Sequence, residues 1–297
     1  MRPVTLRWTG VLLMAVAISC PAALLSAPQE NSAAPAVTPR PMARTVRITS
    51  AALGNSEYAF AVLLPTGYDT STRRYPVLFL LHGGGQTHTA FPSRAWFTRD
   101  AAAREMIVVL PNGGRSFFAN AAGLSAARYE DLIATDLVQY VDTHYRTLAT
   151  RESRAIAGIS MGGFGSALIA LRHPDLFATA GPLSAPLASA RGDGDGPSRV
   201  IFGAPGSEES LARDPLSLVT QLVPGTAPYF YVACGLDDAL LGASREFDRL
   251  LSARNLPHRY VEVPGGHTWA VWDEQLKAFF DVLASRPGWN GAPAARR

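Results

Sequence analysis

The chain has 297 residues, of which 47% are hydrophobic and 17% are charged, a composition that excludes a disordered chain and allows one sizeable hydrophobic core. Lysine and arginine number 27 against 24 aspartate and glutamate residues, which leaves a formal net charge of +3. A charge this small does not indicate a nucleic-acid-binding protein, because such proteins need clustered basic residues.

The first segment of the chain, residues 1–27, has the pattern of a secretory signal peptide. Two arginines precede an apolar run at 11–18 that is too short to span a bilayer, and Leu-Ser-Ala at 25–27 offers a cleavage site. A lipoprotein signal that ends at Cys20 is the alternative. We therefore predict that the mature protein is secreted or periplasmic and has no stable membrane span after processing.

Composition divides the rest of the chain into three parts. Residues 28–43 are rich in proline, alanine and serine, which favours a disordered linker. The apolar patterning of a folded domain covers residues 44–286. Residues 287–297 are expected to form a disordered tail.

Two β-prone stretches open the folded part. Residues 45–48 alternate apolar and polar, and residues 58–64 are mostly apolar, so we predict two strands paired as an antiparallel hairpin. Short apolar runs then recur along the chain, and such runs are typical of strands buried on both faces of a parallel sheet. These runs cover 76–81, 106–110, 155–159, 176–180, 229–233 and 260–263.

Helical segments separate these runs. Apolar residues recur at helical spacing within 132–145, 247–251 and 276–283, and residues 164–172 also favour a helix. Alternating strands and helices predict an α/β fold with a doubly wound, mostly parallel sheet and flanking helices. The segment 187–226 is rich in glycine, serine and proline and breaks this rhythm, so we expect a loop-rich insertion there.

Several classes of site are excluded by what the sequence lacks. Removal of the leader leaves Cys234 as the sole cysteine, which excludes a disulfide framework and a cysteine-rich metal site. None of the six histidines lies in a His-Glu-x-x-His motif, and no P-loop occurs. The sole lysine, Lys277, follows Glu274 by three residues, so no Ser-x-x-Lys motif exists. We predict neither a metal ion nor an organic cofactor.

The strongest motif is Gly-Ile-Ser-Met-Gly at 158–162, with a further glycine after it. A predicted strand precedes it and a predicted helix follows it, which is the context of a nucleophile elbow. The tight turn lifts the hydroxyl of Ser160 out of the sheet, and the glycines on either side let neighbouring chain approach closely. We therefore predict that Ser160 is a nucleophile.

A serine hydroxyl needs a base, and His267 is the best candidate. It follows the last predicted strand and so lies at the carboxyl edge of the sheet, where doubly wound folds bind ligands. His82 precedes three glycines and is expected to hold the shape of that loop. His173 ends the helix after the elbow, which favours a capping role, and His88 is not expected to touch a substrate.

An acid should orient the imidazole and stabilise its cation. Asp237 and Asp238 follow the strand predicted at 229–233, again at its carboxyl end, and either could serve. The chain order Ser, Asp, His is the order of the α/β-hydrolases.

A glycine run supplies the remaining part of the predicted site. Residues 83–85 are three consecutive glycines at the end of a predicted strand, so a backbone N–H can approach an acyl carbonyl without a side chain in the way. The helix N-terminus behind Ser160 offers further N–H groups. We predict that the backbone N–H groups of Gly84 and Met161 form the oxyanion hole.

From residue 44 to 285 the chain resembles the esterase D-type family of α/β-hydrolases, which includes S-formylglutathione hydrolases, feruloyl and other carbohydrate esterases, and mycolyltransferases. The motifs that carry the resemblance are Leu81-His82-Gly83-Gly84, Leu110-Pro111-Asn112-Gly113, Tyr129-Glu130-Asp131, the elbow at 158–163, Arg172-His173-Pro174-Asp175, Cys234-Gly235 with Asp238, and Gly266-His267-Thr268-Trp269.

The resemblance implies the α/β-hydrolase fold for residues 44–286 and a catalytic triad. It selects Asp238 as the acid, as does the tendency of adjacent side chains in extended chain to point apart. The expected function is an exported serine hydrolase that cleaves small-molecule or carbohydrate esters through an acyl-enzyme on Ser160. Transfer of the acyl group to a sugar or glycolipid hydroxyl is the alternative, and a non-catalytic binding protein is a third reading.

Overall fold

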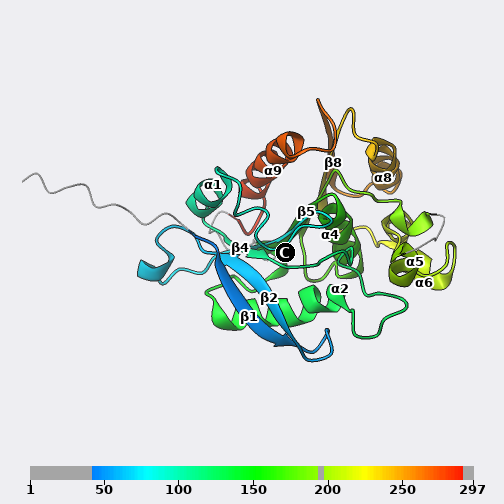
Figure 1. The fold of residues 1–297 in the computed structure, drawn as a ribbon. Coiled ribbons are helices and arrows are strands. Elements are labelled where there is room, and N and C mark those ends of the chain that lie inside the picture. Colours follow the sequence, from blue (N-terminus) through cyan, green and yellow to red (C-terminus); the bar gives the residue numbers. More distant parts are fainter. Residues whose placement is uncertain (1–41, 193–196, 290–297) are drawn as a thin grey trace, which may run out of the picture. The chain divides into compact units, whose positions relative to one another are not determined.

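The structure is a computed structural model that describes residues 42–192 and 197–289. The predicted leader, and the predicted linker up to residue 41, lie outside the described residues. The described chain forms an eight-stranded sheet in the order β1-β2-β4-β3-β5-β6-β7-β8, covered by helices (Figure 1).

The sheet begins with the predicted antiparallel hairpin. Strand β1 (Arg44–Ser50) pairs antiparallel with β2 (Ser56–Leu63), and β2 also pairs antiparallel with β4 (Ile107–Leu110). The hairpin prediction is therefore confirmed, with strands slightly longer than the sequence pattern indicated.

The remaining strands run parallel to β4. They are β3 (Val77–Leu81), β5 (Arg154–Ile159), β6 (Thr179–Leu183), β7 (Tyr229–Gly235) and β8 (His258–Val263). Every residue of β3, β5 and β6 is buried, because helices cover both faces of the central sheet. This is the predicted doubly wound α/β fold.

Alternation along the strands divides the core into two layers. In β3, Val77 and Phe79 pack into one cluster while Leu78 packs into the other, as the two-residue period of a strand requires. Helices α1 (Phe97–Ala103) and α9 (Trp269–Ala284) cover the second cluster and lie together in Figure 1.

The opposite face is covered by three longer helical segments. One runs from α2 (Tyr129–Asp131) through a π-helical stretch (Leu132–Leu137) into α3 (Val138–His144). The others are α4 (Met161–Arg172) and α8 (Leu241–Ala253), and all three segments contribute buried residues to the first cluster.

Strand β6 differs from its prediction. The apolar run at 176–180 indicated a strand, but Leu176 and Phe177 lie in a turn whose amides bond to His173 O, and the strand begins at Thr179. It continues through Gly181, where a Cβ would lie 2.8 Å from the ring of Phe279. The apolar run therefore placed the strand about three residues too early. The strand itself contains a glycine, because α9 packs closely against the sheet at that point.

The insertion at 187–226 is more regular than predicted. It contains three short helices, α5 (Pro197–Phe202), α6 (Glu208–Leu211) and α7 (Pro215–Leu218). Ser207 and Asp214 cap the last two through their side chains, and Pro215 occupies the first turn of α7. In the sequence, these capping residues are the features that indicate the two short helices.

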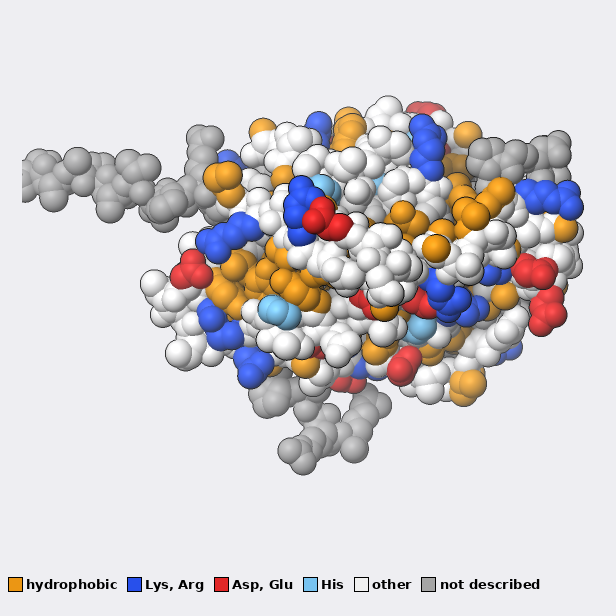
Figure 2. Space-filling model, turned by 60° about the horizontal axis from the view of Figure 1, so that its bottom comes forward, with side chains coloured by type: hydrophobic (Ala, Val, Ile, Leu, Met, Phe, Trp, Pro, Cys, Tyr) orange, Lys and Arg blue, Asp and Glu red, His pale blue; other side chains and the backbone are white. Residues whose placement is uncertain are grey.

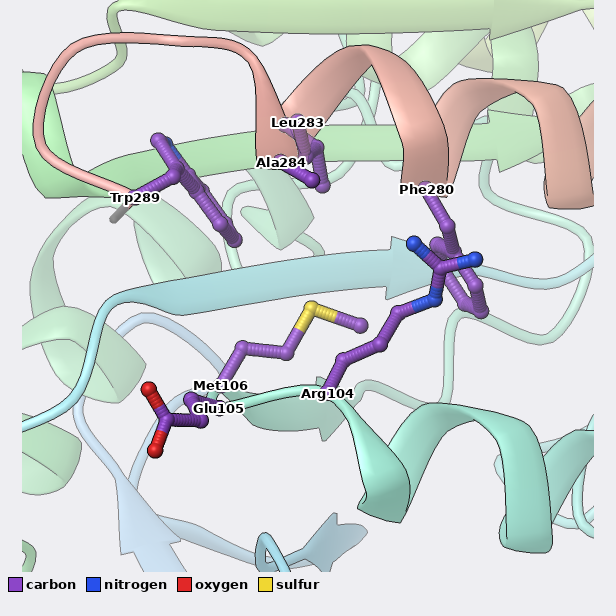
Figure 3. Close-up of a pocket in the computed structure, with 7 residues that line it drawn as sticks. All are labelled: Arg104, Glu105, Met106, Phe280, Leu283, Ala284 and Trp289. Carbon is purple, nitrogen blue, oxygen red and sulfur yellow. The ribbon is translucent and has the colours of Figure 1, made fainter. Parts of the chain in front are cut away.

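The packed chain also extends beyond the predicted end at residue 286. Trp289 is buried, and Gly288 O accepts a hydrogen bond from the side chain of Ser153. Figure 3 shows Trp289 and Leu283 on one side of a cavity of about 320 Å³, with Met106 on the other. No residue of the predicted site lines this cavity. Residues 290–297 lie outside the described residues.

The visible surface carries no extended field of one charge. On the face shown in Figure 2, basic and acidic side chains are interspersed with apolar ones. Within residues 42–192 and 197–289, no helix has the length and apolar character needed to cross a membrane.

Candidate active site

Ser160 lies at the turn between β5 and α4, in the middle of the sheet (Figure 1). Its φ of 51° and ψ of −121° are strained for a residue with a side chain, and such strain costs about 1–3 kcal/mol. The glycines beside it permit this turn. A Cβ at Gly158 would lie 2.4 Å from Gly162 O, and one at Gly162 would lie 2.1 Å from Leu81 O.

His267 lies in the loop between β8 and α9 and connects the other two predicted triad residues. Its Nε2 is 2.9 Å from Ser160 Oγ, and its Nδ1 is 2.8 Å from Asp238 Oδ2. Because an ionised carboxylate only accepts hydrogen bonds, Nδ1 carries the proton and Nε2 is free to accept the serine hydroxyl. The structure thus brings all three predicted residues into one hydrogen-bonded chain.

The two neighbouring aspartates have different surroundings. The side chain of Asp238 is fully buried, and its second oxygen accepts the backbone N–H of Leu240 at 3.0 Å. Asp237 is exposed, and its backbone N–H bonds to Gly265 O at 3.0 Å. The structure places Asp238, and not Asp237, against His267.

The predicted oxyanion donors lie next to each other. A Cβ at Gly84 would lie 3.9 Å from the Cβ of Met161. Within the part of the chain that the structure describes, no acceptor bonds to the backbone N–H of either residue. The N–H of Gly83, by contrast, bonds to the side chain of Gln86 at 3.0 Å, a contact that the sequence reasoning missed.

His82 holds the glycine loop, as the sequence predicts. Its Nε2 accepts the backbone N–H of Gly113 at 2.9 Å, and its Nδ1 is 2.8 Å from Gly83 O. These partners fix the neutral tautomer with the proton on Nδ1, and burial lowers the pKa of the imidazole. The contact with Gly113 links two loops that are distant in sequence, and no local pattern indicates it.

One tryptophan packs against the imidazole of His267, and a second packs against the first. The ring centroid of Trp272 is 4.9 Å from that of His267 with the planes at 85°, and Trp269 lies 5.3 Å from Trp272. Both belong to the first turn of α9, so this helix restricts the orientation of the imidazole from one side.

Other candidate side chains lie outside this constellation. His173 follows the last residue of α4, and its Nε2 is 2.9 Å from the buried carboxylate of Glu130, so it joins two helices. His88 is partly buried, and burial lowers the pKa of its imidazole. Within residues 42–192 and 197–289, no cluster of His, Cys, Asp and Glu could hold a metal ion.

One hollow is lined by the loop whose Gly113 bonds to His82, and another is lined by the glycine loop itself. One, of about 480 Å³, has a mainly apolar wall that includes Leu124, Val200 and Ile201, with Arg115 at its edge. The other, of about 320 Å³, is lined by polar side chains of the loop that begins at Gly85 and by Trp269. Neither hollow is lined by Ser160, Asp238 or His267, but the two loops nearest the site border one apolar and one polar hollow.

Comparison with known proteins is consistent with this geometry. The protein-family model Esterase matches residues 50–281. Esterase Rv1288 of Mycobacterium tuberculosis is 31% identical over 263 residues, which cover 79% of this chain and 58% of that protein. The chain therefore spans less than two thirds of this relative's length.

Two further comparisons cover a larger share of the matched protein. The diacylglycerol acyltransferase/mycolyltransferase Ag85B of Mycobacterium intracellulare is 27% identical, with 72% of this chain and 76% of that protein covered. The structure of FphF, a fluorophosphonate-binding serine hydrolase of Staphylococcus aureus, matches with a TM-score of 0.72 and 27% identity over 82% of this chain and 98% of that one. The chain belongs to the Esterase family and has the α/β-hydrolase fold, as the resemblance to esterase D-type, S-formylglutathione hydrolase-like proteins predicts.

Proposed function

We propose that this protein cleaves carboxylic esters through an acyl-enzyme on Ser160. The observation that carries the proposal is the chain of hydrogen bonds from Asp238 through His267 to Ser160, with the serine raised on a strained turn. Membership of the Esterase family and the likeness to a serine hydrolase support it.

In the first half of the reaction, Ser160 Oγ attacks the acyl carbon while His267 Nε2 takes the hydroxyl proton. Asp238 holds the imidazole in the required tautomer and stabilises the imidazolium that forms. Because the Asp238 side chain is fully buried, this interaction is stronger than it would be in water.

The negative charge on the carbonyl oxygen is stabilised by the backbone N–H groups of Gly84 and Met161, which have no other acceptor among the described residues. The N-terminal end of α4 adds a favourable dipole. His267 then gives its proton to the leaving alcohol, and water repeats the sequence on the acyl-enzyme to release the acid.

We infer the positions of the two parts of the substrate from the two hollows. The leaving group must lie beside His267 because that residue protonates it, and the polar hollow includes Trp269, two residues along the chain. The apolar hollow lies on the side of Gly113 and Arg115, where an apolar acyl group would be buried. This arrangement fits a small-molecule or carbohydrate ester with a polar alcohol part.

A panel of esters tests the proposal. Purified protein should hydrolyse p-nitrophenyl esters of several acyl lengths, and acetylated xylan and feruloyl sugars define the alcohol and acyl preferences. Absence of turnover on every ester, with the protein folded, would refute the proposed function.

Acyl transfer is a second candidate, favoured by the likeness to the mycolyltransferase Ag85B. It uses the same acyl-enzyme but delivers the acyl group to a sugar or glycolipid hydroxyl instead of water. Product analysis with and without a sugar acceptor separates the two, because transfer yields a new ester and hydrolysis yields only free acid.

A further inference from the structure

A second polar cavity lies outside the constellation around Ser160. Three arginines, Arg128, Arg172 and Arg213, line this cavity of about 180 Å³. They come from the segment before α2, from the end of α4 and from the connection between α6 and α7. The cavity therefore lies where the insertion meets the helices of the core.

Two of these guanidinium groups have acidic partners. Arg172 Nε donates to Glu130 Oε1 at 2.6 Å, and the same oxygen is 2.9 Å from His173 Nε2. Arg128 pairs with Asp131, whose carboxylate also accepts from the side chain of Asn120 at 2.8 Å. Both carboxylates are thus already engaged by neighbouring donors.

Arg213 has no carboxylate within ion-pair distance among the described residues. Its guanidinium donates to two backbone carbonyls, Asn120 O at 2.5 Å and Glu209 O at 2.7 Å. Burial lowers the pKa of this group, and so do the positive charges of Arg172 and, more weakly, Arg128. The negative charges of Glu130 and, more weakly, Glu209 partly offset these effects on the pKa.

The cavity therefore holds three positive groups against two paired carboxylates. Each guanidinium keeps N–H groups that no acceptor of the described chain takes up, because the bonds above use only part of its donors. Guanidinium groups bind oxyanions through paired, charge-assisted hydrogen bonds. A cavity of about 180 Å³ is smaller than the pockets that hold drug-sized ligands, which favours a small ion.

We propose that this cavity binds one tetrahedral oxyanion, phosphate or sulfate, between Arg128, Arg172 and Arg213. The bound ion joins the segment 208–214 of the insertion to α2 and α4 through a shared set of hydrogen bonds. It thereby fixes the insertion, whose helix α5 also supplies a wall of the apolar hollow.

Calorimetric titration of the full chain tests this site. Inorganic phosphate and sulfate are titrated separately, with sodium chloride at matched ionic strength as the reference. Glycerol 3-phosphate is titrated to distinguish a free ion from a phosphate ester, and acetate is titrated to distinguish a tetrahedral anion from a carboxylate. The test variants are Arg128→Gln, which besides the proposed anion contact removes only the ion pair with Asp131, and Arg213→Gln. Arg249→Gln, on the exposed face of α8, is the matched control.

The expected result is saturable binding of one phosphate or sulfate per chain. Loss of one charged hydrogen-bond donor should weaken binding about tenfold or more in each test variant and leave the control unchanged. Amide hydrogen exchange in 208–214 should slow when phosphate is added. Arg128→Gln keeps the test decisive if Arg213→Gln fails to fold.

Three results would overturn the proposal. The first is a titration heat with phosphate or sulfate that sodium chloride reproduces at the same ionic strength. The second is phosphate binding at unchanged affinity in both Arg128→Gln and Arg213→Gln when these variants are folded. The third is acetate that binds as tightly as phosphate, which would replace a tetrahedral-anion site with a carboxylate site. Ester turnover does not enter these readouts, so the anion site stands or fails independently of the proposed function.

Discussion

The imidazole of His82 accepts the backbone N–H of Gly113 at 2.9 Å, and this one bond joins the loop that carries Gly84 to the loop that borders the apolar hollow. The same ring bonds to Gly83 O and packs against Phe118 at 5.2 Å between centroids. The predicted oxyanion donor at Gly84 therefore depends on a neutral, buried histidine that takes no part in proton transfer.

This relationship predicts a pH dependence of stability. The folded protein favours neutral His82, because burial lowers its pKa below the usual value of about 6.5 and protonated Nε2 cannot accept the Gly113 N–H. The stabilisation is therefore complete above that unfolded value and is lost as pH falls through it toward the lower folded pKa.

His82→Gln should lower the free energy of unfolding at pH 8 by about 1–3 kcal/mol, the cost of an unsatisfied buried group. It should also flatten the loss of stability between pH 7 and 5. Urea denaturation at several pH values measures both, with His144→Gln, an exposed histidine on α3, as the control. Equal pH slopes for His82→Gln and the unmodified protein would contradict the assignment.

The two aspartates beside the imidazole give a second prediction. Asp238→Asn keeps the shape of the side chain but favours the wrong tautomer of His267, so ester turnover should fall by about four orders of magnitude. Asp237→Asn should lose about tenfold at most, the equivalent of about 1.4 kcal/mol. Steady-state kinetics on one p-nitrophenyl ester compares them, and the reverse ranking would assign the acid to Asp237.

The tight packing at the elbow gives a third prediction. A methyl group at Gly162 would lie 2.1 Å from Leu81 O, so Gly162→Ala must displace backbone and should destabilise the fold by about 1–3 kcal/mol or more. Gly242→Ala is the matched control, because no atom lies within 4 Å of its added Cβ in α8. That control should be neutral or stabilising by about 0.5–1 kcal/mol. Thermal unfolding of both variants measures these changes in stability. Equal stabilities of Gly162→Ala and Gly242→Ala would contradict the tight packing at the elbow.

Export is a fourth prediction, which rests on the sequence of residues 1–27. Secreted material should begin near Pro28, and a chain expressed without these residues should remain in the cytoplasm. N-terminal sequencing checks the first point. A lipid-modified Cys20 would support the lipoprotein alternative, and an uncleaved Met1 on the exported protein would contradict both.

Most of the central sheet could be predicted because its strands are largely apolar, a pattern that burial on both faces imposes. Strand β6 was predicted a few residues too early because Gly181 and Pro182 interrupt its apolar pattern. Gly181 is needed there because α9 packs closely against it. The helices of the insertion are too short for a periodic stripe and are marked only by their caps.

Part of the candidate site could also be predicted from the sequence, and part could not. Ser160, Asp238 and His267 could be singled out because each follows a strand at the carboxyl edge of the sheet. The hydrogen bonds of His82 to Gly113 and of Gln86 to Gly83 could not be predicted, because each depends on the three-dimensional path of the loops. The arginine-lined cavity joins three segments far apart in the sequence, so only the folded chain reveals it.

The central claim is that Ser160 is the nucleophile, and mass spectrometry of protein treated with a fluorophosphonate probe tests it most directly. One adduct per chain should form, and it should map to the peptide that contains Ser160. Ser160→Ala should form none and lose about a millionfold in ester turnover, while Ser252→Ala, an exposed serine on α8, should label and turn over normally. An adduct on another residue, or a Ser160→Ala protein that labels and hydrolyses esters like the unmodified protein, would contradict the account.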